Sequence, residues 1–276
     1  MPTAAASAAS AAASTSAASA RLVIPDLAGK AVLVTGSSTG IGAAVAMAFG
    51  AQGARVAVHY NSSADPAKAV AKTITDAGGT AVLVSGDVSK ADSARRIVNE
   101  AAEALGGLDG LINNAGLMLG RMPIVDMSDS HYDAVMDLNA RSVLVATQAA
   151  VPHMKKRGGG FIVNTTSIAA RNGGGGGALL YAAAKGFVST ITHGTAKELI
   201  PFGIRVNAVS PGLIATPFHE RYTPPDMMKA QVATVPQGRI GIPDDCVGAY
   251  LFLSSSLLSG YIIGQVIEVN GGQLMP

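Results

Sequence analysis

The chain has 276 residues, nearly half of them apolar, and a formal net charge of +2. This length fits one large α/β domain or two small ones, and the apolar share is enough to bury a sizeable core. Charges are sparse and the longest basic run covers only residues 155–157, which argues against a nucleic-acid-binding protein. The single cysteine, Cys246, cannot form a disulfide within the chain and has no metal-ligating neighbour, so we expect a small buried residue in a reducing compartment.

The first twenty residues are almost entirely Ala, Ser and Thr. Because this composition cannot build a packed core, we expect residues 1–26 to be a disordered Ala/Ser-rich tail and residues 27–276 to be the folded, NAD(P)-binding catalytic domain. A secretory signal is not predicted, since no charged segment precedes a leucine-type apolar run. An organelle transit peptide stays open as the alternative, with Arg21 as its only clear positive charge. No later segment has the pattern of a membrane span, and we expect a cytoplasmic protein.

From residue 30 onward, short β-branched runs alternate with longer helical patterns. Several of these runs are continuously apolar, which is typical of strands covered on both faces. The alternation predicts an α/β fold, a single Rossmann-type doubly wound domain with a seven-stranded parallel sheet and helices on both faces. The predicted strands are residues 31–35, 55–59, 81–85, 110–113, 161–166, 205–208 and 265–269.

A glycine-rich turn, Thr35-Gly-Ser-Ser-Thr-Gly-Ile-Gly42, follows the first predicted strand and leads into a helical pattern. Gly36 permits a sharp turn, whereas Gly40 and Gly42 let the backbone approach a pyrophosphate without an intervening Cβ. A plain tight turn also needs glycine, but the strand before and the helix after this turn indicate a dinucleotide site at the helix N-terminus. The expected cofactor contacts in the turn are Gly36, Ser37, Ser38, Thr39, Gly40, Ile41 and Gly42.

The end of the second predicted strand, residues 59–63, indicates which dinucleotide binds. A carboxylate there would accept hydrogen bonds from the ribose 2′-hydroxyl of NAD, but no acid occurs before Asp65. Polar side chains that could donate to a 2′-phosphate are present instead, so the pattern favours NADP(H) over NAD(H). Ordinary capping of the loop by these side chains is the alternative. The contacts expected here are Tyr60, Asn61 and Ser62, together with Ser37 and Ser38 of the turn.

Two glycine runs interrupt the later half of the chain, at residues 158–160 and 173–177. The first is expected to end a helix. Five glycines in a row cannot be held by side-chain packing, so we expect the second run to be mobile. It lies between a predicted strand and a predicted helix, at the carboxyl edge of the sheet where ligands bind in such folds.

Tyr181 and Lys185 follow this second run and are four residues apart, which places them on one face of a helix. A cation beside a phenol favours the phenolate and lowers a pKa that starts near ~10. With the glycine turn upstream, the pair predicts a proton donor held beside a bound dinucleotide. These are the two components needed to reduce a carbonyl. Without that turn, a half-buried aromatic beside a solvated cation would be the better interpretation.

With these motifs the chain resembles the short-chain dehydrogenase/reductase family over residues 27–273. No single motif is decisive, but the ordered set is highly specific. One departure is a single extra residue between Ser167 and Tyr181, within the glycine-rich loop. The matching motifs are the turn at residues 35–42, Asp87-Val88, Asn113-Asn-Ala-Gly116, Asn139, Ser167, Tyr181-Ala-Ala-Ala-Lys185 and Pro211-Gly212.

The resemblance implies four catalytic residues. Tyr181 would be the general acid in carbonyl reduction and the general base in alcohol oxidation, with Lys185 lowering its pKa and contacting the nicotinamide ribose. Ser167 would hydrogen-bond the substrate oxygen, and Asn139 would hold a water in a proton relay that ends at Lys185. The further cofactor contacts implied are Asp87 and Val88 at the adenine, Asn114, Ala115 and Gly116 beside the central strand, and Pro211, Gly212, Ile214 and Thr216 at the nicotinamide.

The substrate pocket is expected near residues 117–122, in the loop 168–180 and after Thr216, where a substrate-covering flap lies in the family. His219 in that flap is expected to be an exposed loop residue. No histidine has a paired spacing with an acid or another histidine, so no catalytic metal is predicted. Most of the expected lining is apolar and suggests a hydrophobic or mixed carbonyl compound: Leu117, Met118, Ile168, Leu213 and Phe218.

Within the family, the chain resembles most the 3-oxoacyl-carrier-protein reductases and the glucose 1-dehydrogenase-like members. A carrier protein needs a basic docking surface, and Phe202 occupies one of its two basic positions. We therefore expect an NADP(H)-dependent oxidoreductase that reduces a carbonyl to a secondary alcohol, or catalyses the reverse. A 3-oxoacyl-carrier-protein reductase and a non-catalytic NADP(H) sensor are the alternatives. The resemblance also implies a homotetramer with a small-molecule substrate, and neither a nucleic-acid nor a membrane partner.

Overall fold

The computed structural model describes residues 23–275, so residues 1–22 of the tail expected at residues 1–26 lie outside this part. Residues 24–26 were also assigned to the tail but belong to the folded domain. Ile24 is buried, and the carboxylate of Asp26 accepts hydrogen bonds from the Ser255 hydroxyl (2.7 Å) and the Ser256 amide (2.7 Å). The predicted domain boundary at residue 27 is therefore too late.

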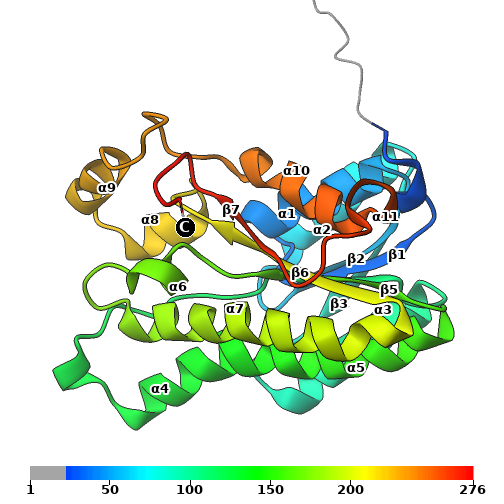
Figure 1. Cartoon of the computed structure of the whole chain (residues 1–276), viewed down its shortest axis with the longest axis horizontal. Helices are drawn as coiled ribbons and strands as arrows, with labels where there is room; N and C mark the ends of the chain where they lie inside the picture. The colour runs from blue at the N-terminus through cyan, green and yellow to red at the C-terminus, as the bar shows by residue number, and fades with distance from the viewer. Residues whose placement is uncertain (1–22, 276) are drawn as a thin grey trace, which may run out of the picture.

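Seven parallel strands form one sheet in the order β3-β2-β1-β4-β5-β6-β7 (Figure 1). Each strand lies within a few residues of its predicted position, and the predicted fold class is confirmed. The strands are β1 (Ala31–Val34), β2 (Arg55–Tyr60), β3 (Thr80–Ser85), β4 (Gly110–Asn113), β5 (Gly160–Thr165), β6 (Ile204–Pro211) and β7 (Val266–Val269).

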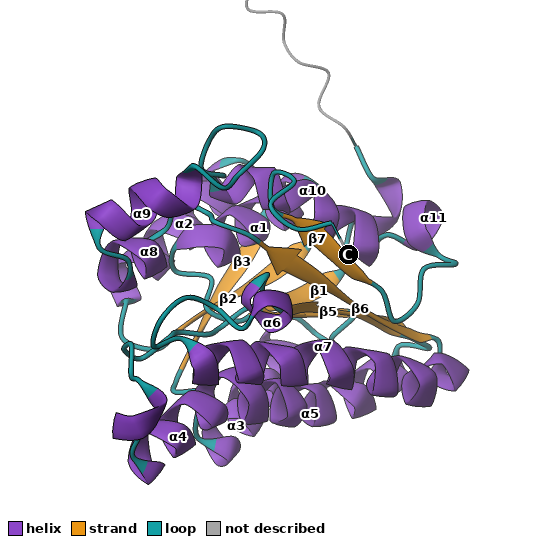
Figure 2. Ribbon diagram, turned by 60° about the vertical axis from the view of Figure 1, so that its left-hand side comes forward, coloured by secondary structure: helices purple, strands orange, loops and turns teal. Residues whose placement is uncertain are grey.

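Helices cover both faces of this sheet (Figures 1 and 2). Successive residues of a strand point to opposite faces, so Val32 and Val34 of β1 pack against one layer while Ala31 and Leu33 pack against the other. Cys246 is buried in the first layer, as expected. The first layer contains α1 (Gly40–Ala51), α2 (Ala64–Asp76) and α10 (Pro243–Ser254), and the second contains α3 (Ala91–Ala104), α5 (Ser142–Lys156) and α7 (Leu179–Leu199).

Shorter elements complete the described chain. Between β4 and α5 lie η2 (Ile124–Asp126), α4 (Asp129–Met136) and the π-helical turn η3 (Asp137–Arg141), and α4, η3 and α5 follow one another without a break. The others are η1 (Pro25–Leu27), α6 (Ala169–Asn172), η4 (Ile200–Phe202), α8 (Pro217–Tyr222), α9 (Pro225–Val232) and α11 (Ser256–Ser259). Within residues 23–275, no helix combines the length and apolarity needed to cross a bilayer.

The order of the strands reverses between β1 and β4. The chain builds β1, β2 and β3 outward in one direction and then crosses back, so that β4 pairs with the free side of β1. Ligands of open parallel sheets bind in the crevice that such a reversal leaves at the carboxyl ends of the strands. The glycine turn after β1 and the segment 114–116 after β4 therefore meet in this crevice.

Candidate active site

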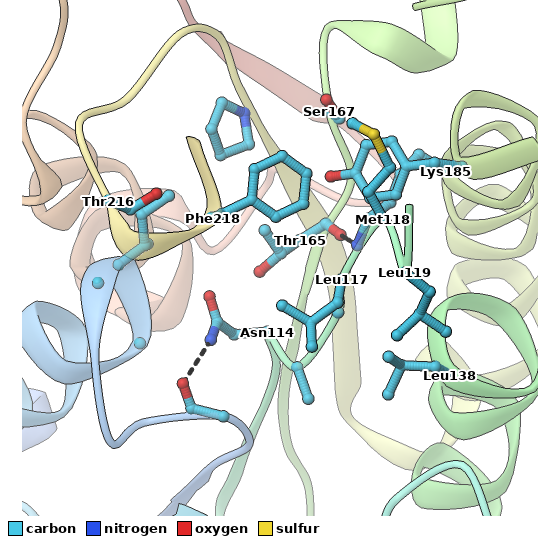
Figure 3. Close-up of a pocket in the computed structure, with 18 of the residues that line it drawn as sticks. Asn114, Leu117, Met118, Leu119, Leu138, Thr165, Ser167, Lys185, Thr216 and Phe218 are labelled. Atoms are coloured by element: carbon cyan, nitrogen blue, oxygen red, sulfur yellow. Dashed lines mark hydrogen bonds between the residues drawn. The ribbon is translucent and has the colours of Figure 1, made fainter. Parts of the chain in front are cut away.

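A cavity of about 740 Å³ opens at the carboxyl ends of the strands. This volume lies within the range of small-molecule and cofactor sites. Every predicted cofactor residue except Ser37 lines the cavity, as do Ser167, Tyr181 and Lys185. Figure 3 shows several of these side chains, which come from β-strand ends, from α7 and from the segment around α8. Motifs that are far apart in the sequence thus meet around one cavity.

The turn after β1 requires glycine for two different reasons. Gly36 and Gly40 have φ angles of 63° and 58°, in the left-handed region that disfavours side chains. Gly42 is needed for space, because a Cβ there would lie 2.3 Å from the Gly36 carbonyl oxygen and 2.4 Å from Asn114 Nδ2. Since α1 begins at Gly40, the free amides of its first turn lie at the cavity wall. This arrangement fits a bound pyrophosphate.

Ser37 does not take the predicted position. Its side chain is fully buried, and its hydroxyl donates to the Val34 carbonyl at 2.7 Å and accepts from the His59 amide at 2.9 Å. The hydroxyl therefore ties the turn to β2 and does not face a 2′-phosphate. The other three polar residues predicted for that role, Ser38, Asn61 and Ser62, do line the cavity.

His59 holds the turn in place, a role that the sequence alone did not suggest. Its Nδ1 accepts a hydrogen bond from the Gly36 amide at 2.9 Å, and its Nε2 donates to the Gly86 carbonyl at 3.0 Å. This pair of partners requires the neutral tautomer, and burial lowers the pKa of His59, which favours the same form. The imidazole thus connects the phosphate turn to the loop that carries Asp87. A histidine at the end of a buried strand, beside a turn with free amides, was the available signal.

Asn114 and Thr35 brace the same turn from the side of β4. Asn114 Nδ2 donates to the carbonyls of Thr35 (2.9 Å) and Gly36 (3.1 Å). In return, the Thr35 hydroxyl accepts from the amides of Asn114 (2.9 Å) and Ala115 (3.1 Å). Figure 3 shows Asn114 at the wall of the cavity with one of these bonds drawn. The turn and the segment after β4 therefore form one hydrogen-bonded wall.

Tyr181 and Lys185 lie one helical turn apart on α7, as predicted. Lys185 Nζ is 5.8 Å from the centre of the phenol ring and donates to the Thr165 carbonyl at 2.8 Å (Figure 3). Ser167, just after β5, forms a side-chain hydrogen bond with Tyr181. The end of β5 and the first turns of α7 thus bring a hydroxyl, a phenol and an ammonium group to one side of the cavity.

The acidities of this pair differ from the prediction. Burial raises the pKa of Tyr181 to about 12, and the hydrogen bond with Ser167 opposes this effect only in part. Burial also lowers the pKa of Lys185 to about 8. The predicted lowering of the pKa of Tyr181 is therefore wrong for the protein as described, because burial raises this pKa. Tyr181 consequently keeps its proton at neutral pH, which is the form that a general acid requires.

Asn139 lies behind Lys185, on the π-helical turn η3, and is fully buried. Its Nδ2 donates to the carbonyls of Leu117 (2.8 Å) and Val135 (2.9 Å), but its Oδ1 has no partner among the described residues. A Cβ on Gly116 would lie 2.7 Å from this oxygen and 3.1 Å from Lys185 Nζ. Glycine thus leaves open a small polar space between the two groups, which is suited to a bridging water.

The other end of the cavity is formed by the three segments predicted to line it. Its apolar wall includes Phe218, whose ring lies 5.4 Å from the Tyr181 ring and 5.3 Å from the Tyr222 ring. Figure 3 shows Leu117, Met118 and Phe218 around the same space. The sequence alone did not single out the polar residues of this wall, which are Arg121, Asn172, Arg221 and Gln231.

His219 is not the exposed loop residue that the sequence suggested. It lies on α8, is partly buried and lines the cavity, with Nδ1 at 3.0 Å from the Thr223 hydroxyl. Burial first, and then the positive charge of Arg121, lower the pKa of His219 to about 4. The imidazole is therefore neutral at neutral pH.

The glycine run at residues 173–177 has specific contacts that the expectation of a mobile loop did not include. The Gly176 carbonyl accepts from Arg121 Nη1 at 2.7 Å, and the Gly177 carbonyl accepts from the Met122 amide at 2.9 Å. These bonds connect the run to the segment after β4. No group of three or more His, Cys, Asp or Glu side chains comes together as a metal site anywhere in residues 23–275.

Comparisons with known proteins cover nearly the whole described chain. A family model described as enoyl-(acyl carrier protein) reductase matches residues 36–273. An uncharacterised oxidoreductase of Methylorubrum extorquens is 42% identical over 248 residues, which is 89% of this chain and 98% of that protein.

Two solved structures are similar over their full length. The NADH-dependent reductase A1-R′, described as responsible for alginate metabolism, is 39% identical with a TM-score of 0.83 and covers 91% of this chain and 100% of its own. A short-chain dehydrogenase from Burkholderia cenocepacia, in complex with NADP, is 36% identical with a TM-score of 0.83 and covers 90% of this chain and 98% of its own. Proteins of this similarity are thus described as dependent on NADH or as bound to NADP.

Proposed function

The chain belongs to the short-chain dehydrogenase/reductase family, and on that premise we propose that it is an NADP(H)-dependent reductase of a carbonyl compound. Family membership makes it an oxidoreductase that uses NAD(P) and acts on CH–OH or carbonyl groups. The observation that carries the proposal is the meeting of Ser167, Tyr181 and Lys185 in a cavity that also contains the glycine turn.

The residues of the cavity fit a dinucleotide. Gly42 leaves a backbone cradle that a Cβ would fill, and the amides of the first turn of α1 lie beside it. Asp87 and Val88 would hold the adenine, and the segment from Pro211 to Thr216 would hold the nicotinamide. When bound, the cofactor supplies the hydride.

The protein itself supplies the proton. Tyr181 donates the proton that its raised pKa retains, while Ser167 donates a hydrogen bond to the same substrate oxygen. Lys185, with a pKa of about 8, exchanges protons near neutral pH with a water held at Asn139 Oδ1. In the reverse direction Tyr181 accepts the proton of the alcohol.

We favour NADP(H) because the end of β2 lacks a carboxylate that would repel a 2′-phosphate. Ser38, Asn61 and Ser62 line the cavity at that end and offer donors in its place. Since relatives use either dinucleotide, the preference rests on these residues of the chain itself.

A carrier-protein substrate is the weaker candidate. Lys155 Nζ lies 3.2 Å from the centre of the Phe202 ring, and Arg157 Nε lies 3.1 Å from Asp109 Oδ1. Two of the three basic residues at 155–157 therefore have partners within the chain. A sensor without turnover is weaker still, because it has no use for the proton donor formed by Ser167 and Tyr181.

We also propose a cytoplasmic homotetramer. The family resemblance puts α5 and α7 in an interface between subunits, and α7 exposes the apolar side chains of Leu179 (46%) and Phe187 (36%). Sedimentation analysis measures the mass in solution. A monomer would contradict this part of the proposal without affecting the chemistry.

The reductase proposal is tested by following NADPH absorbance with ketones, aldehydes, quinones and a β-ketoacyl thioester. We expect oxidation of NADPH with at least one small carbonyl compound, and a loss of about 10²–10⁴-fold in Tyr181→Phe with NADPH binding retained. Tyr261→Phe removes the same hydroxyl from a fully exposed position and should have no effect. Full activity in Tyr181→Phe would contradict the role of the phenol. NADPH binding without turnover across the panel would favour the sensor.

A further inference from the structure

Arg121 is a cation without a carboxylate partner at the substrate end of the cavity. Its Nε donates to the Tyr222 carbonyl at 2.8 Å and its Nη1 to the Gly176 carbonyl at 2.7 Å. Both partners are neutral, and none of the ion pairs in the described part of the chain includes this guanidinium. Arg121 is also partly buried, and burial lowers its pKa. A partly desolvated cation of this kind gains most from an anion that enters the cavity.

A second donor converges on the same space. A Cβ on Gly175 would lie 3.5 Å from Arg121 Nη1 and 3.7 Å from Gln231 Nε2. Both side chains line the cavity. The side-chain amide of Gln231 has no hydrogen-bond partner among the described residues, where only its backbone carbonyl accepts from a side chain. The missing side chain at residue 175 therefore leaves free a space that a guanidinium and an amide approach together.

The acidic side chains that line the cavity do not pair with Arg121. The cavity's only carboxylate side chains belong to Asp87, at the predicted adenine end, and Asp137, which forms an ion pair with Arg141 at 2.7 Å. By contrast, Arg221 lines the substrate end together with Arg121. The positive charge of Arg121 also contributes to the lowered pKa of His219. The charged side chains that line the substrate end of the cavity are therefore cationic.

A chain of contacts through Phe218 connects the Arg121 guanidinium to the proposed proton donor, Tyr181. The Phe218 ring contacts the rings of Tyr181 and Tyr222, and the backbone carbonyl of Tyr222 accepts from Arg121. An apolar wall thus separates the proton donor from the guanidinium. A ligand that satisfies both groups has a carbonyl at one end, an anionic group at the other and an apolar segment between them.

We propose that Arg121, assisted by Gln231, binds the carboxylate of an oxo-acid substrate whose carbonyl lies at Tyr181. This inference rests on the proposed reductase function. In the reaction, the carbonyl carbon accepts a hydride from NADPH, which becomes NADP⁺, and the carbonyl oxygen accepts the proton of Tyr181. The product is a hydroxy acid, and the carboxylate is unchanged.

The test compares oxo acids with their methyl esters, across a series in which the number of methylene groups between carbonyl and carboxylate varies. For the best spacing, we expect the wild type to have a kcat/KM for the acid about ten- to hundredfold above that for the ester. Arg121→Gln should lower the ratio of kcat/KM for the acid over the ester to about one, whatever the lost contacts with Tyr222 and Gly176 do to both values. Arg121→Lys should retain part of the preference, since a point charge replaces a bidentate donor.

Arg95→Gln is the matched control, because it removes an arginine charge from α3, outside the cavity, and should leave the ratio unchanged. The ratio of kcat/KM for the acid to kcat/KM for the ester does not change if disturbed loops lower both values by the same factor. If Arg121→Gln does not fold, Gln231→Leu should lower the ratio by a smaller factor.

Equal kcat/KM for acid and ester in the wild type, or a preference that survives Arg121→Gln, would overturn the carboxylate site. The reductase function would stand in both cases, provided that a neutral ketone is reduced. If no carbonyl compound is reduced at all, the reductase proposal fails and the carboxylate site fails with it.

Discussion

The two ends of the cavity are built in different ways. At the cofactor end, the turn after β1 is held from two neighbouring strands, by His59 at the end of β2 and by Asn114 just after β4. At the substrate end, the helices α8 and α9 contain no buried residue, and the long side chain of Arg121 connects α8 to the glycine run.

The difference separates what the fold supplies from what individual side chains supply. The cofactor end follows from the reversal of strand order, which any chain with this topology shares. The substrate end is formed by a few side chains on weakly packed segments, which can change without cost to the core. Mutations at the cofactor end should therefore affect stability and nucleotide binding, whereas those at the substrate end should affect the choice of substrate.

A pair of glycine substitutions tests this contrast with the largest expected effect. Gly42→Ala places a Cβ against the Gly36 carbonyl, so we expect NADPH affinity to fall at least about a hundredfold and the free energy of unfolding to fall by about 3 kcal/mol. Gly176→Ala meets nothing within 4 Å and should change the free energy by no more than about 0.5 kcal/mol. Fluorescence titration and urea unfolding measure both. Similar effects in the two variants would remove the contrast.

His59 provides the next test. His59→Ala leaves the partly buried Gly36 amide without its acceptor, which should cost about 1–3 kcal/mol in stability and weaken NADPH binding about tenfold or more. His59→Asn offers an amide oxygen near the position of Nδ1 and should recover part of both losses. His131→Ala, on α4 and outside the cavity, is the control. Wild-type affinity in His59→Ala would show that the imidazole does not hold the turn.

The cofactor preference gives a smaller expected effect. Asn61→Asp introduces a carboxylate at the end of β2, and we expect the ratio of kcat/KM for NADPH over NADH to fall about tenfold. The repulsion acts only on a 2′-phosphate, so kcat/KM with NADH should be retained or should rise. Wild-type enzyme that prefers NADH under the same conditions would contradict the argument made from β2.

The smallest expected effect is a pH dependence that arises at the substrate end. The pKa of His219 is about 4 in the folded chain and 6.5 in its ordinary state, so between these values the unfolded chain binds more protons. The free energy of unfolding should therefore fall as the pH drops from 6.5 towards 4, by about 1 kcal/mol once partial exposure is considered. Urea unfolding at about pH 7 and about pH 5 measures this fall, and His219→Gln should reduce it. An unchanged slope in that variant would assign the effect to other groups.

The sequence predicted the sheet and most of the cofactor end because both depend on local patterns. Apolar runs predicted all seven strands, and the glycines at 36, 40 and 42 are required by backbone geometry that the spacing already indicates. The pairing of Tyr181 with Lys185 follows from helical periodicity in the same way.

The failures share one physical cause, which is burial by segments distant in the sequence. Ser37 is turned inward by its bond to His59 on the next strand, and the pKa of Tyr181 rises because Phe218 and the cavity wall remove water from it. Arg121 donates a hydrogen bond to Tyr222, which lies about a hundred residues later in the chain, and no local sequence pattern predicts such a contact. The substrate end, where such contacts dominate, is therefore the part that the sequence alone does not predict.

The π-helical turn η3 makes the position of Asn139 sensitive to the length of the chain as well as to the identity of its side chains. Because α4, η3 and α5 are continuous, removing one residue there would restore an ordinary α-helical turn and keep α4 and α5 in phase, so that only the residues of the wide turn, Asn139 among them, would change position. Asn139 would then move away from Lys185 even though the sequence still contained every side chain of the cavity. Single-residue deletions, which surface loops generally tolerate, should be as damaging at this position as the loss of the asparagine itself.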